Sequence, residues 1–268
     1  MHPEAEREDG LARAARLVAG SQHLVALVGA GLSVESGIPP FRGPGGLWAK
    51  VGEPSMMSYQ RFMDDPASWW AQRLIDEQSS QGPRAEFRLA IDQAQPNKGH
   101  HALVELERLG ILKLIITQNV DNLHRAAGSA NVAEIHGNRT RLRCLNCLAR
   151  YPRSEFVTDT LPPRCPRCGG LVKSDTVMFG EPIPPDVLAI CQRETEQCDG
   201  MLVIGTSGAV YPAAGFPGAA REHGAFLVEV NTSATPLTHL CDVALHGPSG
   251  ELLPRLVSKV RQQLPSQR

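Results

Sequence analysis

Apolar residues follow two patterns along the chain, one typical of buried strands and one typical of amphipathic helices. Short, nearly continuous apolar runs of strand length occur at 23–28, 111–117, 201–205, 226–230 and 243–247. Segments with helical periodicity separate them, at 10–19, 99–109, 186–197, 213–223 and 250–263. This alternation predicts an α/β fold, with a mostly parallel sheet and helices on both of its faces.

Polar and glycine residues follow directly after most of these predicted strands. The first strand runs into the turn at 29–31, and the others are followed by polar residues near 118–119, 206–207, 231 and 249. The carboxyl ends of parallel strands meet at one edge of a sheet, and ligands of open α/β sheets bind there. We therefore expect the ligand site at this edge.

Two regions break the alternation and contain no clear strand of the large sheet. They indicate a smaller part inserted into a single domain of 268 residues. The large part is predicted at about 1–40, 98–137 and 179–268. The small part is predicted at 41–97, as a loop with a helical module, and at 138–178, which holds most of the cysteines.

Two Cys-x-x-Cys pairs, Cys144 with Cys147 and Cys165 with Cys168, stand 17 residues apart. Each tight turn can direct two sulfurs at one ion, and two such turns form a tetrahedral zinc site. Four thiolates leave no open coordination position, so we expect one structural zinc ion. The alternatives are a redox dithiol or four unrelated cysteines.

Composition and charge narrow the classes of partner. The chain has 27 Lys and Arg against 28 Asp and Glu, a net charge of −1, and its hydrophobic content is 42%. This balance does not favour a nucleic-acid or membrane-surface partner. The N-terminus MHPEAEREDG lacks a signal-peptide core. We expect a cytoplasmic protein whose remaining cysteines, Cys191, Cys198 and Cys241, are buried thiols.

The turn Gly29-Ala30-Gly31 is weak evidence of function when it is taken alone. The third glycine of a dinucleotide-binding fingerprint would fall at Val34. The turn could present backbone N–H groups to a pyrophosphate, or it could simply join a strand to a helix. The residues of this turn do not decide between the two.

Longer motifs surround this turn and recur in order along the chain. They are GAGLSVESGIPPFR at 29–42, TQNVDNLH at 117–124, HG at 136–137, VMFGE at 177–181, GTS at 205–207 and NTS at 231–233. Together with the four cysteines, this set closely resembles the sirtuin family, from about residue 11 to residue 257. The resemblance implies a Rossmann-like part joined to a smaller part with a zinc ribbon, and a cleft for NAD and an acylated lysine between them.

The resemblance also implies a reaction and the residues that perform it. The acyl group of a protein lysine would be transferred to ADP-ribose, which releases nicotinamide and gives O-acyl-ADP-ribose. His136 matches the general base, and Asn119 matches a second residue of the catalytic site. Residues expected to contact NAD are Gly29, Ala30, Gly31, Ser33, Phe41, Arg42, Gln118, Asn119, Asp121, Gly205, Thr206, Ser207, Asn231, Thr232 and Ser249.

The substrate side is expected to use strand addition, which reads main chain more than sequence. Val177, Phe179 and Gly180 match the segment that pairs with the acylated peptide. A subclass of the family that removes acidic acyl groups carries Tyr-x-x-Arg in its acyl pocket. Trp70 and Arg73 have that spacing here, with tryptophan in place of tyrosine, so we expect neutral acyl groups to be preferred.

Other functions remain open at this stage. The same site could transfer ADP-ribose to another acceptor or hydrolyse NAD, since only the nucleophile differs. A non-catalytic zinc-ribbon binding module and a hydride-transferring dehydrogenase are the alternatives from other classes. The sequence leaves the oligomeric state open, with a monomer as the simplest case.

Overall fold

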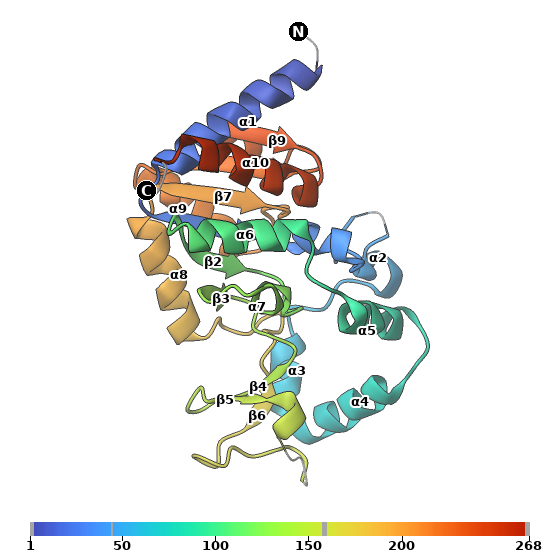
Figure 1. The fold of residues 1–268 in the computed structure, drawn as a ribbon. Coiled ribbons are helices and arrows are strands. Elements are labelled where there is room, and N and C mark those ends of the chain that lie inside the picture. Colours follow the sequence, from blue (N-terminus) through green and yellow to red (C-terminus); the bar gives the residue numbers. More distant parts are fainter. Residues whose placement is uncertain (1–2, 44, 157–159, 266–268) are drawn as a thin grey trace.

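A six-stranded parallel sheet forms the centre of the larger part of the molecule (Figure 1). The computed structural model describes residues 3–43, 45–156 and 160–265. The strand order is β3-β2-β1-β7-β8-β9, and every neighbouring pair runs parallel. The strands are β1 (Leu24–Val28), β2 (Leu112–Thr117), β3 (Val132–Glu134), β7 (Gly200–Ile204), β8 (Phe226–Asn231) and β9 (Val243–His246).

Helices cover both faces of this sheet, as the alternating pattern predicts. On one face lie α1 (Pro3–Gly20), α6 (Lys98–Arg108) and α10 (Ser249–Gln263), which pack against each other and the strands. The other face carries α8 (Pro185–Gln197) and α9 (Phe216–Glu222). Side chains of β1 alternate between the two cores, which explains why all five of its residues are buried.

The predicted strands and helices of the large part are confirmed, and one strand is new. Every apolar run of strand length corresponds to an observed strand, and the face Leu11, Ala14, Ala15 and Val18 of α1 is fully buried. The additional strand β3 pairs with the outer side of β2 through only three residues. The strand ends at Glu134, two residues before His136, and so places that histidine at the edge of the sheet.

A second, antiparallel sheet of order β5-β4-β6 lies below the first in the view of Figure 1. Its strands are β4 (Arg141–Cys144), β5 (Arg150–Pro152) and β6 (Val172–Ser174), and its neighbours include α3 (Ser58–Asp64) and α4 (Pro66–Gln78). Phe62 and Trp70 of these helices form one core with Leu142 and Val172 of the sheet. Two segments distant in sequence therefore form one packed unit.

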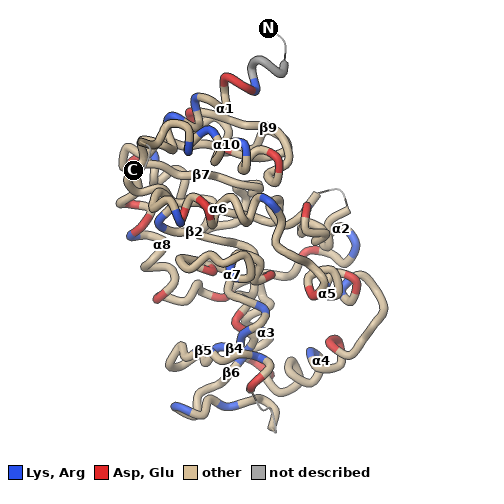
Figure 2. The backbone as a smooth tube through the Cα atoms, in the orientation of Figure 1, with Lys and Arg blue, Asp and Glu red and all other residues tan. Residues whose placement is uncertain are grey.

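The helices α2 (Leu47–Val51) and α5 (Pro83–Gln93) contact each other. In α5, Ile91 packs against Ile38 and Leu123 of the large part, next to the short helix α7 (Leu123–Ala127). Charged residues of both signs are interspersed along most of the backbone (Figure 2). No helix of the described residues is long and apolar enough to cross a membrane.

Candidate active site

A cleft of about 2200 Å³ opens between the two sheets. Its floor is formed by the carboxyl ends of β1, β2, β7 and β8, where the strand order reverses between β1 and β7. Its other walls come from residues 40–58, from α4 and α5, and from the segment 176–183. A cleft at the point where the order of a parallel sheet reverses is the expected ligand position of this fold.

The glycine turn after β1 lies directly against the turn after β7. The Gly31 N–H donates to the Gly205 carbonyl at 2.8 Å. A Cβ atom on Gly29 would lie 2.7 Å from the Gly205 oxygen, and one on Gly31 would lie 2.6 Å from the Gly205 Cα. Only glycine allows this approach, so the turn has a packing reason for its composition besides any role in binding phosphate.

Asn119 is held rigidly at the bottom of the cleft. Its side-chain amide donates to the Gly29 carbonyl and to Ser33 Oγ, both at 3.1 Å, and its N–H donates to Thr117 Oγ1. The side chain is 5% exposed. With its NH₂ group used in this way, Asn119 can offer its amide oxygen to a ligand as an acceptor.

Asp121 lies beside Asn119 at a small side cavity that also includes Ser33 and Phe41. Its carboxylate accepts from Ser33 Oγ at 2.7 Å and from the Leu123 N–H at 2.9 Å. Burial raises the pKa of Asp121, and these two hydrogen bonds act in the opposite direction. The cavity therefore places a carboxylate and a hydroxyl directly beside the Asn119 amide.

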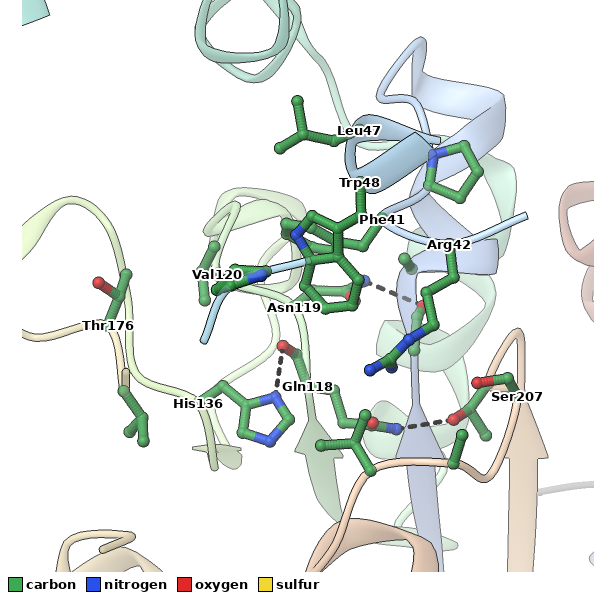
Figure 3. A pocket seen from close by; sticks show the side chains of 18 of the residues that line it. Phe41, Arg42, Leu47, Trp48, Gln118, Asn119, Val120, His136, Thr176 and Ser207 are labelled. Atoms are coloured by element: carbon green, nitrogen blue, oxygen red, sulfur yellow. Dashed lines mark hydrogen bonds between the residues drawn. The ribbon is translucent and has the colours of Figure 1, made fainter. Parts of the chain in front are cut away.

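His136 faces the cleft from the loop after β3, next to Gln118 (Figure 3). Its Nδ1 lies 3.2 Å from the Gln118 carbonyl oxygen. A carbonyl only accepts, so Nδ1 carries the proton and Nε2 keeps a free lone pair. Burial lowers the pKa of His136, so the ring is neutral at neutral pH. The arrangement can take up a proton at Nε2.

Gly137 fixes the position of His136 against the small part. Its φ is +77°, and a Cβ atom there would lie 2.0 Å from the Asp175 carbonyl oxygen. We expect Gly137→Ala to lower the free energy of unfolding by about 3 kcal/mol or more, because strain and a backbone clash combine. Urea denaturation measures this loss.

Gly110→Ala is the matched control for that substitution. Gly110 has a φ of +73°, but no atom lies within 4 Å of a Cβ atom built there. This variant should show only the cost of the left-handed backbone, about 1 kcal/mol. Equal losses in the two variants would contradict the close contact between Gly137 and Asp175.

The residues predicted for the adenosine half line the far end of the cleft. Thr206 connects them: its hydroxyl accepts from Gln118 Nε2 at 2.9 Å, and its carbonyl accepts from Asn231 Nδ2 at 3.0 Å. Ser207 and Thr232 are exposed, and the buried Ser249 donates to Glu35 at 3.1 Å. All six predicted residues from 205 to 249 line this one surface.

The loop after β1 covers the cleft with aromatic side chains. Phe41 contacts Trp48 and Phe87, with ring centroids 5.3 and 5.1 Å apart, and Trp48 stands edge-on to Phe179 at 5.4 Å. Arg42 lies over the Trp48 ring at 4.4 Å and forms an ion pair with Glu53. Our sequence analysis did not single out Trp48, although GPGGLW directly follows the motif that contains Phe41.

The segment expected to pair with a peptide is not a regular strand. Residues 177–180 run from an extended stretch into a turn, with a φ of +81° at Gly180. The Val177 N–H donates to the His136 carbonyl at 2.9 Å, and the Phe179 carbonyl accepts from the Tyr59 N–H at 3.1 Å. Among the described residues, the Val177 carbonyl and the Phe179 N–H have no backbone partner, and both are free for strand addition.

The structure corrects the position expected for Trp70. Its side chain is 1% exposed, packs in the core of the small part, and donates from Nε1 to the Val172 carbonyl at 3.0 Å. Trp70 does not line the cleft, whereas its neighbour Trp69 and Arg73 do. Arg73 Nε lies 3.0 Å from Glu77, and the guanidinium lies over the Trp69 ring at 5.3 Å.

The four predicted zinc ligands come together away from the cleft. Their sulfurs lie within 4.8 Å of one another, with 3.5 Å between Cys144 and Cys168 and 3.7 Å between Cys147 and Cys165. A tetrahedral ion with Zn–S bonds of about 2.3 Å requires sulfurs about 3.8 Å apart. The cluster therefore fits one zinc ion.

The backbone around these sulfurs is shaped for the same ion. The N–H groups of Asn146 and Cys147 point at Cys144 Sγ, and the Tyr151 hydroxyl lies 3.0 Å from Cys165 Sγ. A Cβ atom on Gly170 would approach Cys144 Sγ to 3.0 Å. When it is bound, the ion would cross-link the turn after β4 with the turn before β6, and it would have no open position for a substrate.

Comparison with known proteins agrees with this geometry. A model of the Sir2 family matches residues 29–212. The chain belongs to the Sir2 family. Among its relatives is NAD-dependent protein deacylase 2 of Pyrobaculum aerophilum, which is 42% identical over 93% of this chain and 96% of its own length. The NAD-dependent protein deacylase of Pyrococcus abyssi is also 42% identical, over 93% and 98% of the two chains.

Solved Sir2 structures share the whole architecture. A Sir2 homologue in complex with NAD has 41% identity and a TM-score of 0.77, and the match covers 94% of each chain. Sir2Af2 bound to a myristoylated histone peptide has 36% identity and a TM-score of 0.68, over 95% of this chain and 98% of that one. The similarity therefore includes both the parallel sheet and the small part.

Proposed function

We propose that this protein is an NAD-dependent protein-lysine deacylase, with deacetylation as its main activity. The observation that carries the proposal is the geometry of His136. Its neutral ring is fixed by the Gln118 carbonyl and presents Nε2 to a cleft that Asn119 also lines, with Asp121 in the side cavity next to Asn119. The names of the relatives, NAD-dependent protein deacylases, support the same function.

The chain's own residues suit each task of this reaction. Asn119 and Asp121 would orient the ribose and the carboxamide of nicotinamide with acceptor oxygens, and Arg42 would bind the diphosphate. The acyl oxygen would then attack C1′ of the ribose as nicotinamide leaves. His136 Nε2 would take the proton from a ribose hydroxyl, which lets that oxygen attack the acyl carbon. Addition of one water and departure of the lysine amine from that carbon would then give O-acyl-ADP-ribose and free lysine. Phe41 and Trp48 would exclude water from C1′.

The second substrate would be an acylated lysine in a protein or peptide. The free Val177 carbonyl and Phe179 N–H support pairing with its main chain. A neutral acyl group is favoured over an acidic one, because Glu77 already lies 3.0 Å from Arg73 Nε and also pairs with Arg153. A carboxylate on the acyl group would compete with Glu77 for both arginines.

A panel of lysine peptides tests both the function and the acyl preference. With NAD and acetyl, propionyl, butyryl, succinyl or myristoyl peptides, we expect O-acyl-ADP-ribose from the neutral short chains. We expect kcat/KM for the succinyl peptide to be lower by about tenfold or more. Product is measured by mass spectrometry.

Two outcomes of this panel would decide against the proposal. Release of nicotinamide at the same rate without any acyl peptide would show NAD hydrolysis instead. Appearance of ADP-ribose on a protein would show ADP-ribosyl transfer. A succinyl peptide that reacts best would reject only the acyl preference.

The remaining proposals concern organisation and location. We propose one catalytic domain, with its large part at about 1–40, 98–137 and 179–268 and its small part at 41–97 and 138–178. None of the seven cysteines, all of them among the described residues, forms a disulfide, which supports a reducing, cytoplasmic location. We expect neither a nucleic-acid nor a membrane partner, and a monomer is the simplest state.

A further inference from the structure

The segment 174–181 carries the free backbone groups but has little sheet structure of its own. It leaves β6 at Ser174, and its N–H groups at Asp175 and Val177 donate to the carbonyls of Arg141 and His136, at 3.0 and 2.9 Å. Beyond Val177, the segment has no assigned secondary structure until the turn at Phe179–Gly180, and it ends at Glu181. Its shape therefore has to be held by side chains.

Lys173 is the first of these side chains. It is 0% exposed, and its ammonium group donates to the carbonyls of Ser174 and Thr176 at 2.8 and 2.7 Å. Its third partner is Glu181, whose Oε2 lies 2.9 Å from Nζ. All three donors of the ammonium are thereby used on one short segment.

Glu181 closes the segment from its other end. Its Oε2 also accepts the Met178 N–H at 2.8 Å, and its Oε1 accepts from Arg143 Nη2 at 2.6 Å. The ion pair thus joins Glu181, the last residue of the segment, to Lys173, which directly precedes it. A closed loop results, with Val177 and Phe179 on it.

The surroundings of this pair are charged but balanced. Arg143 Nε lies 3.0 Å from Asp175 Oδ1, and Arg150 connects Asp175 to Asp186. Basic and acidic positions accordingly lie together around β4 and β6 (Figure 2). Burial lowers the pKa of Lys173 to about 8, and Glu181 opposes that shift. The ammonium is therefore mainly charged at neutral pH, which the ion pair requires.

We propose that Lys173 and Glu181 are positioning residues that hold segment 174–181 ready for the acylated peptide, which rests on the function proposed above. The ammonium satisfies the Ser174 and Thr176 carbonyls without a neighbouring strand. A strand in that position would satisfy them equally well, but it would leave less of the segment open to the cleft. Because the Lys173 side chain, and not a strand, binds these carbonyls, the Val177 carbonyl and the Phe179 N–H stay available to the substrate.

The steady-state kinetics of Lys173→Met and Glu181→Gln test this role. We expect the KM for an acetyl-lysine peptide to rise about tenfold or more in Lys173→Met, because the peptide meets a disordered segment. The KM for NAD and kcat should stay within about threefold, since neither residue lines the NAD end of the cleft. Glu181→Gln keeps an oxygen for the Met178 N–H, so its effect should be smaller.

Lys113→Met is the matched control. Lys113 on β2 also donates to a backbone carbonyl, that of Gly110, but it is exposed and does not line the cleft. Its kinetic constants should equal those of the wild type. Amide hydrogen exchange at Val177–Gly180 adds a readout that does not depend on turnover. Exchange there should be faster in Lys173→Met than in Lys113→Met.

The outcomes separate this inference from the proposed function. A wild-type protein that deacylates peptides, with variants whose peptide KM and exchange are unchanged, would overturn the positioning role alone. A fall in kcat with constant peptide KM, or an equal rise in both KM values, would also overturn it. A wild-type protein that neither binds nor deacylates acyl peptides would overturn both. If Lys173→Met does not fold, the peptide KM of Glu181→Gln decides.

Discussion

His136→Ala should lower the turnover of an acetyl-lysine peptide by about a hundredfold to ten-thousandfold, the usual contribution of a general base. The reason is geometric. The Gln118 carbonyl fixes the proton on Nδ1, so Nε2 is the ring atom left to accept one in the cleft. Alanine removes this acceptor but leaves the walls that bind NAD and the peptide. Single-turnover kinetics with both substrates saturating measures the loss.

The pH dependence of the wild-type turnover tests the role of His136 as general base in a second way. Burial lowers the pKa of His136 below its ordinary value of 6.5. The base is therefore neutral at neutral pH, and activity should fall only as the pH drops through a value below 6.5. This acid limb should be absent from the residual activity of His136→Ala.

His223→Ala is the control for the histidine substitution. His223 is exposed at the end of α9, with Nδ1 against the Ala219 carbonyl. It resembles His136 in bonding to a backbone carbonyl but lies outside the cleft. Full activity of this variant, with a loss in His136→Ala, would support the assignment. Nearly full activity of His136→Ala would reject it.

The sheet could be predicted because its strands are buried on both faces. Such strands appear as continuous apolar runs, and β1 and β7 have no exposed residue. Strand β3 escaped prediction because it has only three residues, one of them Glu134. Glu134 is retained there because it pairs with Arg125 and Arg141, and pairing across space cannot be read from local periodicity.

The acyl-pocket prediction failed at Trp70 for a reason of helical phase. Trp69 and Trp70 are adjacent on α4, so their side chains point about 100° apart. Trp70 and Arg73 have the spacing of the Tyr-x-x-Arg motif. However, Trp70 is buried in the core of the small part, and it is Trp69 that lines the cleft together with Arg73. Sequence alone gives the composition of a helix but not which of two adjacent aromatic residues is turned inward.

The ion network around Glu181 was also beyond prediction. Lys173 lies on β6 and Glu181 follows a turn, and the two pair because the chain turns at Gly180. Only glycine fits at this turn, because a Cβ atom on residue 180 would lie 2.1 Å from the Met56 carbonyl oxygen. By contrast, the cysteine cluster was predictable. Its spacing encodes two tight turns that each carry two ligands, whatever the rest of the fold.

Removal of zinc is expected to destroy the small part before the large one. Structural zinc sites contribute about 10–16 kcal/mol in isolated zinc-finger peptides, which matches or exceeds the whole stability of an ordinary domain of about 5–15 kcal/mol. Cys144 and Cys165 belong to the same core as Phe62, Trp70 and Val172. Loss of the ion would therefore loosen α3, α4 and β6 together.

The expected consequence is a loss of peptide binding that precedes the loss of NAD binding. Segment 174–181 continues from β6, whereas the residues predicted for the adenosine half lie at the carboxyl edge of the large sheet. Isothermal titration after treatment with a strong chelator, or with Cys144→Ala, should show a peptide affinity at least about a hundredfold weaker, and added zinc should restore the chelated protein. Cys198→Ala, which changes a buried thiol outside the cluster, is the control. A metal-free protein that is stable and fully active would contradict the structural role of the four cysteines, while simultaneous loss of both ligands would show that the two parts unfold as one unit.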